Sequence, residues 1–183
     1  MELIFKTPHG SHLYGLNHAD SDEDFYSVYR REVKRTNHTR YKWAKQSIVD
    51  GVDTVRVDFG TWVRWCDKGV PQALEAMFSP VPIVDEISAY RAAYRVGITN
   101  MRDTYYRTMD NFVQEGSIKR KRHALRLFLN LRQANRYGRF NPRLTARQKF
   151  WVEQVAQRFD DETVLRLVLS NRMDNDVTDL LRR

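Results

Sequence analysis

The hydrophobic periodicity of this chain changes near residue 80, and this change constrains the fold more than any other feature of the sequence. Before residue 80, short apolar or aromatic runs alternate with turn residues, a pattern that predicts β-strands at 3–7, 24–30 and 53–57. Beyond residue 82, apolar residues recur at helical spacing almost throughout. The sequence therefore predicts an α+β fold, with a sheet-containing lobe over residues 1–80 and a helical lobe over residues 81–183.

Helix signals accompany the predicted strands in the first lobe. Gly10 begins a predicted helix that runs through Leu16, Asp58 is the predicted N-cap of a second helix, and a third spans 71–78. The second lobe is predicted to contain helices at 84–115, with a break near Gly97 left open, and at 117–137, 145–159, 161–170 and 174–182.

A basic segment at 30–45 joins the second predicted strand to the third. It contains one acidic residue, Glu32, and shows little periodicity, which is typical of a long mobile loop. A solvated connector is the simpler interpretation, and contact with a large anionic acceptor is the alternative.

Positive charge is concentrated in the second lobe. Residues 1–80 contain 11 Lys and Arg against 11 Asp and Glu, so the net charge of +8 comes from residues 81–183. Between residues 116 and 152 there are eleven basic residues and no acidic one. A field of one sign favours a polyanionic ligand such as a nucleoside triphosphate or RNA, while a solubilising helix surface is the alternative.

The cysteine content, the apolar runs and the start of the sequence indicate the cellular compartment. Cys66 is the single cysteine, so no disulfide can form within the chain. No apolar run approaches the ~20 residues that span a bilayer, and no signal-peptide pattern is present at the start. We expect an intracellular, cytoplasmic protein with no membrane contact.

The chemistry-bearing motif lies between the first two predicted strands. Gly10 and Ser11 form a turn suited to phosphate, and Asp22 and Asp24 follow at alternate positions, so their side chains point to one side of an extended chain. Neighbouring carboxylates repel each other unless cations lie between them. A third carboxylate is expected from a neighbouring strand, and Asp53 is preferred because Asp58 has the simpler role of helix cap.

A second candidate feature lies on the predicted helix 117–137. Lys119, His123, Arg126 and Asn130 are spaced four, three and four apart, which predicts one narrow stripe along the helix. This stripe could hold phosphates across a cleft from the Gly10 turn, or it could be an ordinary exposed helix face. Glu75 is expected to have a structural partner, with a basic residue of the helical lobe as the candidate.

These motifs resemble those of the nucleotidyltransferase superfamily typified by DNA polymerase beta, and within it those of the predicted nucleotidyltransferases of bacteria and phages. The resemblance covers about residues 3–145. Its motifs are Gly10-Ser11-His12-Leu13-Tyr14-Gly15, Ser21-Asp22-Glu23-Asp24, Val52-Asp53 with Asp58, Gly69-Val70-Pro71-Gln72-Ala73-Leu74-Glu75 with Ser79-Pro80, and Lys119, His123 and Arg126. The chain departs from the family at His12, where many relatives have Arg, and at Ser27, where Gly usually precedes the Val.

The resemblance implies a small mixed sheet with flanking helices and transfer of a nucleoside monophosphate from a nucleoside triphosphate, with release of pyrophosphate. It implies Mg²⁺ or Mn²⁺ as cofactor, held by Asp22, Asp24 and Asp53. The predicted nucleotide-binding residues are Gly10, Ser11, Tyr14, Lys119, His123 and Arg126, although core packing is the default interpretation of Tyr14.

The acceptor is left open between an RNA or tRNA end and a protein hydroxyl. A catalytically silent, nucleotide-sensing protein that binds RNA or regulates a partner is the alternative function. The base preference and the oligomeric state are also left open, as is a phage origin.

Overall fold

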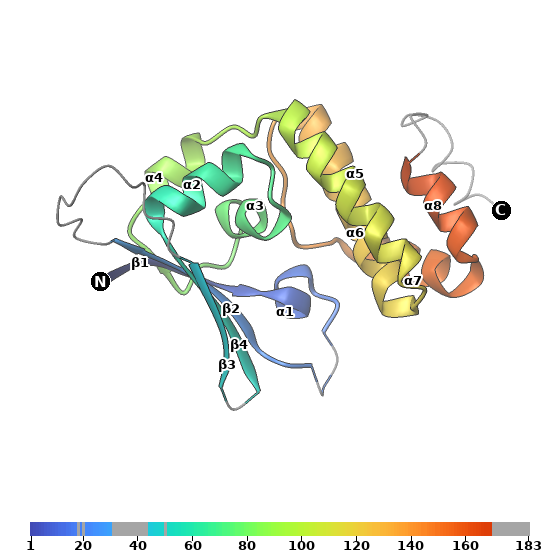
Figure 1. Cartoon of the computed structure of the whole chain (residues 1–183), viewed down its shortest axis with the longest axis horizontal. Helices are drawn as coiled ribbons and strands as arrows, with labels where there is room; N and C mark the ends of the chain where they lie inside the picture. Colours follow the sequence, from blue (N-terminus) through green and yellow to red (C-terminus); the bar gives the residue numbers. More distant parts are fainter. Residues whose placement is uncertain (18, 20, 31–43, 50, 170–183) are drawn as a thin grey trace.

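A mixed β-sheet carries the first lobe, and a group of long helices forms the second (Figure 1). This is the arrangement in the computed structural model, which describes every residue except 18, 20, 31–43, 50 and 170–183. The mixed sheet and the helical C-terminal half confirm the predicted α+β fold. In the described part of the chain, no helix is long and apolar enough to cross a membrane.

The sheet has one parallel contact among antiparallel ones. Its strands are β1 (Glu2–His9), β2 (Asp24–Arg30), β3 (Ala44–Val49), β4 (Val52–Asp58) and β5 (Val84–Asp85), in the order β3-β4-β2-β1-β5. Strands β2 and β4 pair in parallel, whereas β1–β2, β1–β5 and β3–β4 are antiparallel. The parallel pair brings the starts of β2 and β4 to the same end of the sheet.

The helices divide between the lobes. They are α1 (Gly10–Tyr14), α2 (Phe59–Asp67), α3 (Pro71–Met77), α4 (Ser88–Ala93), α5 (Ile98–Gln114), α6 (Ile118–Tyr137), α7 (Ala146–Arg158) and α8 (Asp161–Leu169). Figure 1 shows α2, α3 and α4 on one side of the sheet and α5 to α8 grouped beside it. Because β5 and α4 lie with the sheet, we assign β1 to β5 and α1 to α4 to the first lobe, and α5 to α8 to the second.

Local capping fixes several helix starts where the sequence predicts them. The Asp58 carboxylate accepts a hydrogen bond from the Thr61 backbone N–H at 3.1 Å, which confirms the predicted N-cap of α2. Ser117 caps α6 in the same way, and Thr145 begins α7 with a reciprocal capping box.

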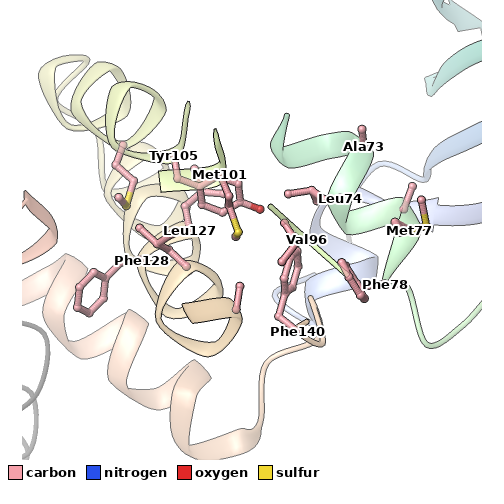
Figure 2. Packing of buried hydrophobic residues seen from close by; sticks show 14 of the residues in the cluster. Ala73, Leu74, Met77, Phe78, Val96, Met101, Tyr105, Leu127, Phe128 and Phe140 are labelled. Carbon is pink, nitrogen blue, oxygen red and sulfur yellow. The ribbon is translucent and has the colours of Figure 1, made fainter. Parts of the chain in front are cut away.

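One hydrophobic core extends through both lobes. Within the first lobe, Phe5 of β1 stacks on Trp62 of α2 with ring centroids 5.5 Å apart. Between the lobes, buried Leu74 of α3 and Met101 of α5 belong to the same core cluster (Figure 2). Since the two lobes share their apolar interior, the surfaces that face each other are held in a defined relation.

Three secondary-structure predictions differ from the structure or fall outside it. The predicted helix 84–115 is wrong at its start, because Val84 and Asp85 pair with β1. The break left open near Gly97 is present, since α4 ends at Ala93 and Gly97 is the N-cap of α5. Strand β3 begins at Ala44, inside the segment predicted as a loop. The predicted helix at 174–182 and residues 31–43 of the basic segment lie outside the described residues.

Candidate active site

Two carboxylates meet where the parallel strands begin. Asp24, the first residue of β2, is the direct register partner of Asp53 on β4. Partners on adjacent parallel strands present their side chains to the same face of the sheet. Asp58 is instead paired with Tyr29 at the other end of β4, and its carboxylate caps α2. The structure therefore brings Asp53, and not Asp58, beside Asp24.

The Gly10 turn lies against the same carboxylate. Gly10 follows β1 directly, and its neighbour His9 is the antiparallel register partner of Asp24. Gly10 has φ of +62°, and a Cβ atom added there would lie 2.0 Å from Asp24 Oδ2. A side chain at position 10 is thus excluded both by backbone conformation and by space. The predicted residues Gly10 and Ser11 begin α1 at the edge of the Asp24–Asp53 pair.

The electrostatics of Asp24 show which charges gather around it. Burial raises the pKa of the Asp24 carboxyl above its ordinary value, and the negative charges of Asp53 and Asp22 raise it further. His12 and Lys119 act in the opposite direction and lower that pKa. Lys119 stands at the start of α6, so the second lobe contributes positive charge to a cluster of carboxylates from the first.

Of the two oxygens of the Asp53 carboxylate, one accepts a hydrogen bond from a described residue and the other does not. Its Oδ2 accepts a hydrogen bond from Gln46 Nε2 of β3 at 2.6 Å. Its Oδ1 is buried and has no hydrogen-bond partner among the residues that the structure describes. A buried carboxylate oxygen without a partner is costly, because it has lost its hydration without replacement. Gln46 lies on β3, a strand that the sequence pattern does not predict, so nothing in the sequence places it at this site.

These residues can be tested as ligands for a divalent cation. Over the described residues, no three His, Cys, Asp or Glu side chains converge into a ready-made metal-binding group. Asp22 lies exposed before β2, while Asp24 and Asp53 are already paired. The carboxylate oxygens of Asp24 and the unpartnered Oδ1 of Asp53 are hard oxygen donors of the kind that Mg²⁺ and Mn²⁺ prefer. The donor chemistry fits such a cation.

The predicted stripe on α6 divides into two parts. Lys119 is exposed, and His123 is partly buried with its ring 5.5 Å from that of Phe112. Burial, followed by the nearby positive charge of Arg126, lowers the pKa of His123 to about 4. His123 is therefore neutral near physiological pH and offers a hydrogen bond rather than a charge.

Further along α6, the stripe is buried, so the interpretation as an ordinary exposed helix face does not hold for Arg126 and Asn130. Arg126 is 3% exposed and Asn130 is 1% exposed, because the middle of α6 packs against neighbouring elements. The Arg126 guanidinium forms an ion pair with Glu75, which confirms the expected partner of Glu75 in the helical lobe.

Tyr14 joins this buried pair. Its hydroxyl donates to Glu75 Oε2 at 2.6 Å, and the Arg126 guanidinium lies 3.7 Å from the centroid of its ring. Tyr14 is also buried, as core packing predicts. The three side chains link α1, α3 and α6, so they connect the Gly10 turn to the helix that carries Lys119.

Two further cations lie beside α1 without having been singled out in the sequence. Next to Gly15, the C-cap of α1, a Cβ atom would be 2.5 Å from Lys149 Nζ and 4.0 Å from Arg143 Nε. Both belong to the basic stretch 116–152, but nothing in their spacing indicates that α7 and the loop before it return to α1. This contact is set by the tertiary fold.

Comparison with known proteins places the chain in a family. A search of curated proteins found no match. Residues 1–161 match the family described as RlaP, RNA repair pathway DNA polymerase beta family, which confirms the resemblance suggested by the motifs. Because the match covers most of the chain, the protein belongs to the RlaP family of DNA polymerase beta-type nucleotidyltransferases.

Proposed function

We propose that this protein transfers a nucleoside monophosphate from a nucleoside triphosphate to a terminal hydroxyl of RNA, in a metal-dependent reaction that releases pyrophosphate. The observation that carries the proposal is the register pairing of Asp24 with Asp53, with Gly10 packed against the Asp24 carboxylate. Family membership supports the reaction class.

Each residue at the carboxylate end of the sheet has a proposed role. Asp22, Asp24 and Asp53 would hold Mg²⁺ or Mn²⁺, which supplies charge neutralisation for the triphosphate and the leaving pyrophosphate when bound. The Asp53 carboxylate, oriented by Gln46, accepts the proton of the attacking hydroxyl. The Gly10 turn and the Ser11 hydroxyl donate hydrogen bonds to the triphosphate.

The second lobe completes the proposed nucleotide site. Lys119 provides a positive charge for the phosphates, and neutral His123 provides a hydrogen bond. Arg126 and Tyr14 are proposed to act by position, because both are buried around Glu75. Their role is to hold α1 against α6, in place of the direct nucleotide contact that the sequence suggests.

RNA is the proposed acceptor for two reasons. The family description names an RNA repair pathway. In addition, Lys149 and Arg143 lie beside α1, and across the described residues neither forms an ion pair with an acidic side chain. Unpaired cations next to a phosphate-binding turn suit a nucleic-acid backbone.

An acceptor screen tests this function. The protein is incubated with α-labelled triphosphates and Mg²⁺, with RNA, tRNA and protein acceptors in parallel. We expect label on RNA with the wild type and with Asp58→Asn, since Asn also caps helices, and none with Asp24→Asn. Transfer that survives in Asp24→Asn would contradict the proposed site.

The same screen separates the alternative function. A catalytically silent, nucleotide-sensing protein would retain RNA in a salt-sensitive manner and transfer no label. Label on tRNA or protein in preference to other RNA would keep the reaction and change the acceptor.

A further inference from the structure

A cavity lies away from the carboxylates, between α3, α4 and the loop that joins α6 to α7. Its volume is about 460 Å³, within the range of about 300–1,000 Å³ that is typical of small-molecule sites. None of the residues proposed for metal or nucleotide binding lines it. We propose that this cavity is a second binding site for a nucleotide, recognised as a planar ring with oxygen acceptors and a phosphate.

The floor of the cavity consists of packed aromatic rings and an arginine whose hydrogen-bond donors are occupied. Phe78, at the end of α3, and Phe140, in the loop after α6, face each other with ring centroids 5.0 Å apart (Figure 2). Buried Arg91 donates to the backbone carbonyls of Ala76, Met77 and Ser79 and pairs with Asp85. Because its donors are occupied in this way, Arg91 shapes the wall and leaves ligand recognition to other groups.

Two amide side chains that line the cavity, Gln133 and Asn141, offer hydrogen-bond donors. Gln133 Oε1 accepts from the Asn141 backbone N–H at 3.2 Å, and Asn141 Oδ1 accepts from the Arg143 backbone N–H at 2.9 Å. Since a backbone N–H can only donate, these bonds identify the amide oxygens, and among the described residues the two NH₂ groups are left free to donate to a ligand. A ligand with several acceptor oxygens fits these donors.

The cavity also carries positive charge. Arg139 is exposed, and its guanidinium lies 5.7 Å from the centroid of the Phe78 ring, with a long contact of 3.5 Å to the Ala92 carbonyl. No Asp or Glu is among the described residues that line the cavity. Arg139 is therefore placed to pair with an anionic group such as a phosphate.

An aromatic side chain stands at the rim of this cavity. Tyr137, the last residue of α6, is 60% exposed and lines the cavity together with Arg139. The Arg136 guanidinium lies 5.3 Å from the centroid of the Tyr137 ring. An exposed aromatic ring beside a guanidinium is a surface on which a nucleobase stacks. Ring, cation and amide donors together favour a nucleotide over an inorganic anion or an apolar ligand.

Helix α6 links the two sites. Gln133 and Tyr137 continue the 4-3-4-3-4 spacing that begins at Lys119, so they lie on the same helical stripe. Lys119 acts on Asp24 at one end of this stripe, and the cavity lies at the other end. The bound nucleotide can be free in solution or part of an RNA strand, and the chemistry of the cavity is the same for both.

The experiment measures binding without catalysis. Full-length protein carrying Asp24→Asn is titrated, in the presence of EDTA, with each nucleoside monophosphate and separately with a short single-stranded RNA. Arg139→Glu and Tyr137→Ala test the cavity, and Arg102→Glu on α5 is the matched charge control, since Arg102 is exposed and does not line the cavity. NMR spectra of the Gln133 and Asn141 side-chain amides report occupancy directly.

We expect saturable binding that perturbs both side-chain amides, an affinity loss of about tenfold in Arg139→Glu, and no loss in Arg102→Glu. Monophosphate binding assigns the site to a free nucleotide, and binding of RNA with the same losses assigns it to a strand. The proposal is overturned if binding of neither the monophosphates nor the RNA saturates by about 10 mM. It is also overturned if Arg139→Glu has the same affinity as the protein with Arg139 intact. Since catalysis plays no part, these outcomes leave the transfer reaction to its own test.

Discussion

Replacing Glu75 tests whether the buried contact between the lobes is structural. Glu75 is 0% exposed and receives the Arg126 guanidinium and the Tyr14 hydroxyl, while Arg126 is itself 3% exposed. Glu75→Leu would leave a buried guanidinium without its counter-charge. A broken buried ion pair costs about 3–5 kcal/mol of unfolding free energy.

The loss of unfolding free energy should depend on which of Glu75, Arg126 and Tyr14 are still present. Tyr14→Phe removes one hydrogen bond to a charged acceptor and should cost about 1.5–3 kcal/mol. Arg126→Met should cost about as much as Glu75→Leu, because it leaves a buried carboxylate unpaired. The double variant Glu75→Leu/Arg126→Met removes both charges together and should cost well below the sum of its parts.

Urea unfolding followed by circular dichroism and tryptophan fluorescence measures these differences. The exposed pair of Glu2 and Arg30 is the control, and its disruption should change stability by about 0–1 kcal/mol. Additive costs of Glu75→Leu and Arg126→Met, or a cost of Glu75→Leu no greater than that of the control, would refute the reasoning. Arg126 would then be available for the phosphate contact that its place in the sequence suggests.

Three further predictions concern the carboxylate end of the sheet. Gln46→Ala should weaken Mg²⁺ activation by about 10–100-fold, measured as the Mg²⁺ concentration for half-maximal transfer, because Gln46 orients Asp53; an unchanged requirement would exclude that role. Gly10→Ala should abolish transfer and cost at least about 1–2 kcal/mol in urea unfolding, because φ is +62° and the new Cβ would meet Asp24; full activity would rule out this packing. The pKa of His123, lowered from 6.5 to about 4, means that the unfolded chain binds the proton more readily, so the free energy of unfolding should fall as pH drops from 6.5 to 4. His123→Gln should reduce that fall, and an identical pH profile in both proteins would contradict the assignment.

The sequence predicts local structure well where one signal dominates. Helix α6 follows from its periodicity and from Ser117 and Gly138 at its ends, and β2 follows from a short aromatic run. Strand β5 could not be predicted, because two residues of an edge strand carry no pattern of their own and form by pairing with β1. The same reasoning explains β3, which depends on its partner β4.

The candidate site is predictable in its motif and less so in its surroundings. A third carboxylate is expected from a neighbouring strand, with Asp53 preferred because Asp58 is the simpler choice as a helix cap, and the strand register pairs Asp53 with Asp24. The burial of Arg126 could not be read from helical spacing, because a stripe of polar residues looks the same whether it faces water or a buried carboxylate. Lys149 reaches α1 through long-range packing, which spacing along one chain does not contain.

The central claim is that the carboxylates paired across β2 and β4 form the catalytic site, and one comparison tests it most directly. The rate of transfer of labelled nucleoside monophosphate to RNA is measured with Mg²⁺ for the wild type, Asp53→Asn and Asp58→Asn. We predict that Asp53→Asn abolishes transfer and that Asp58→Asn retains it, because Asp53 is the register partner of Asp24 while Asp58 caps α2. Transfer that persists in Asp53→Asn and disappears in Asp58→Asn would contradict the account.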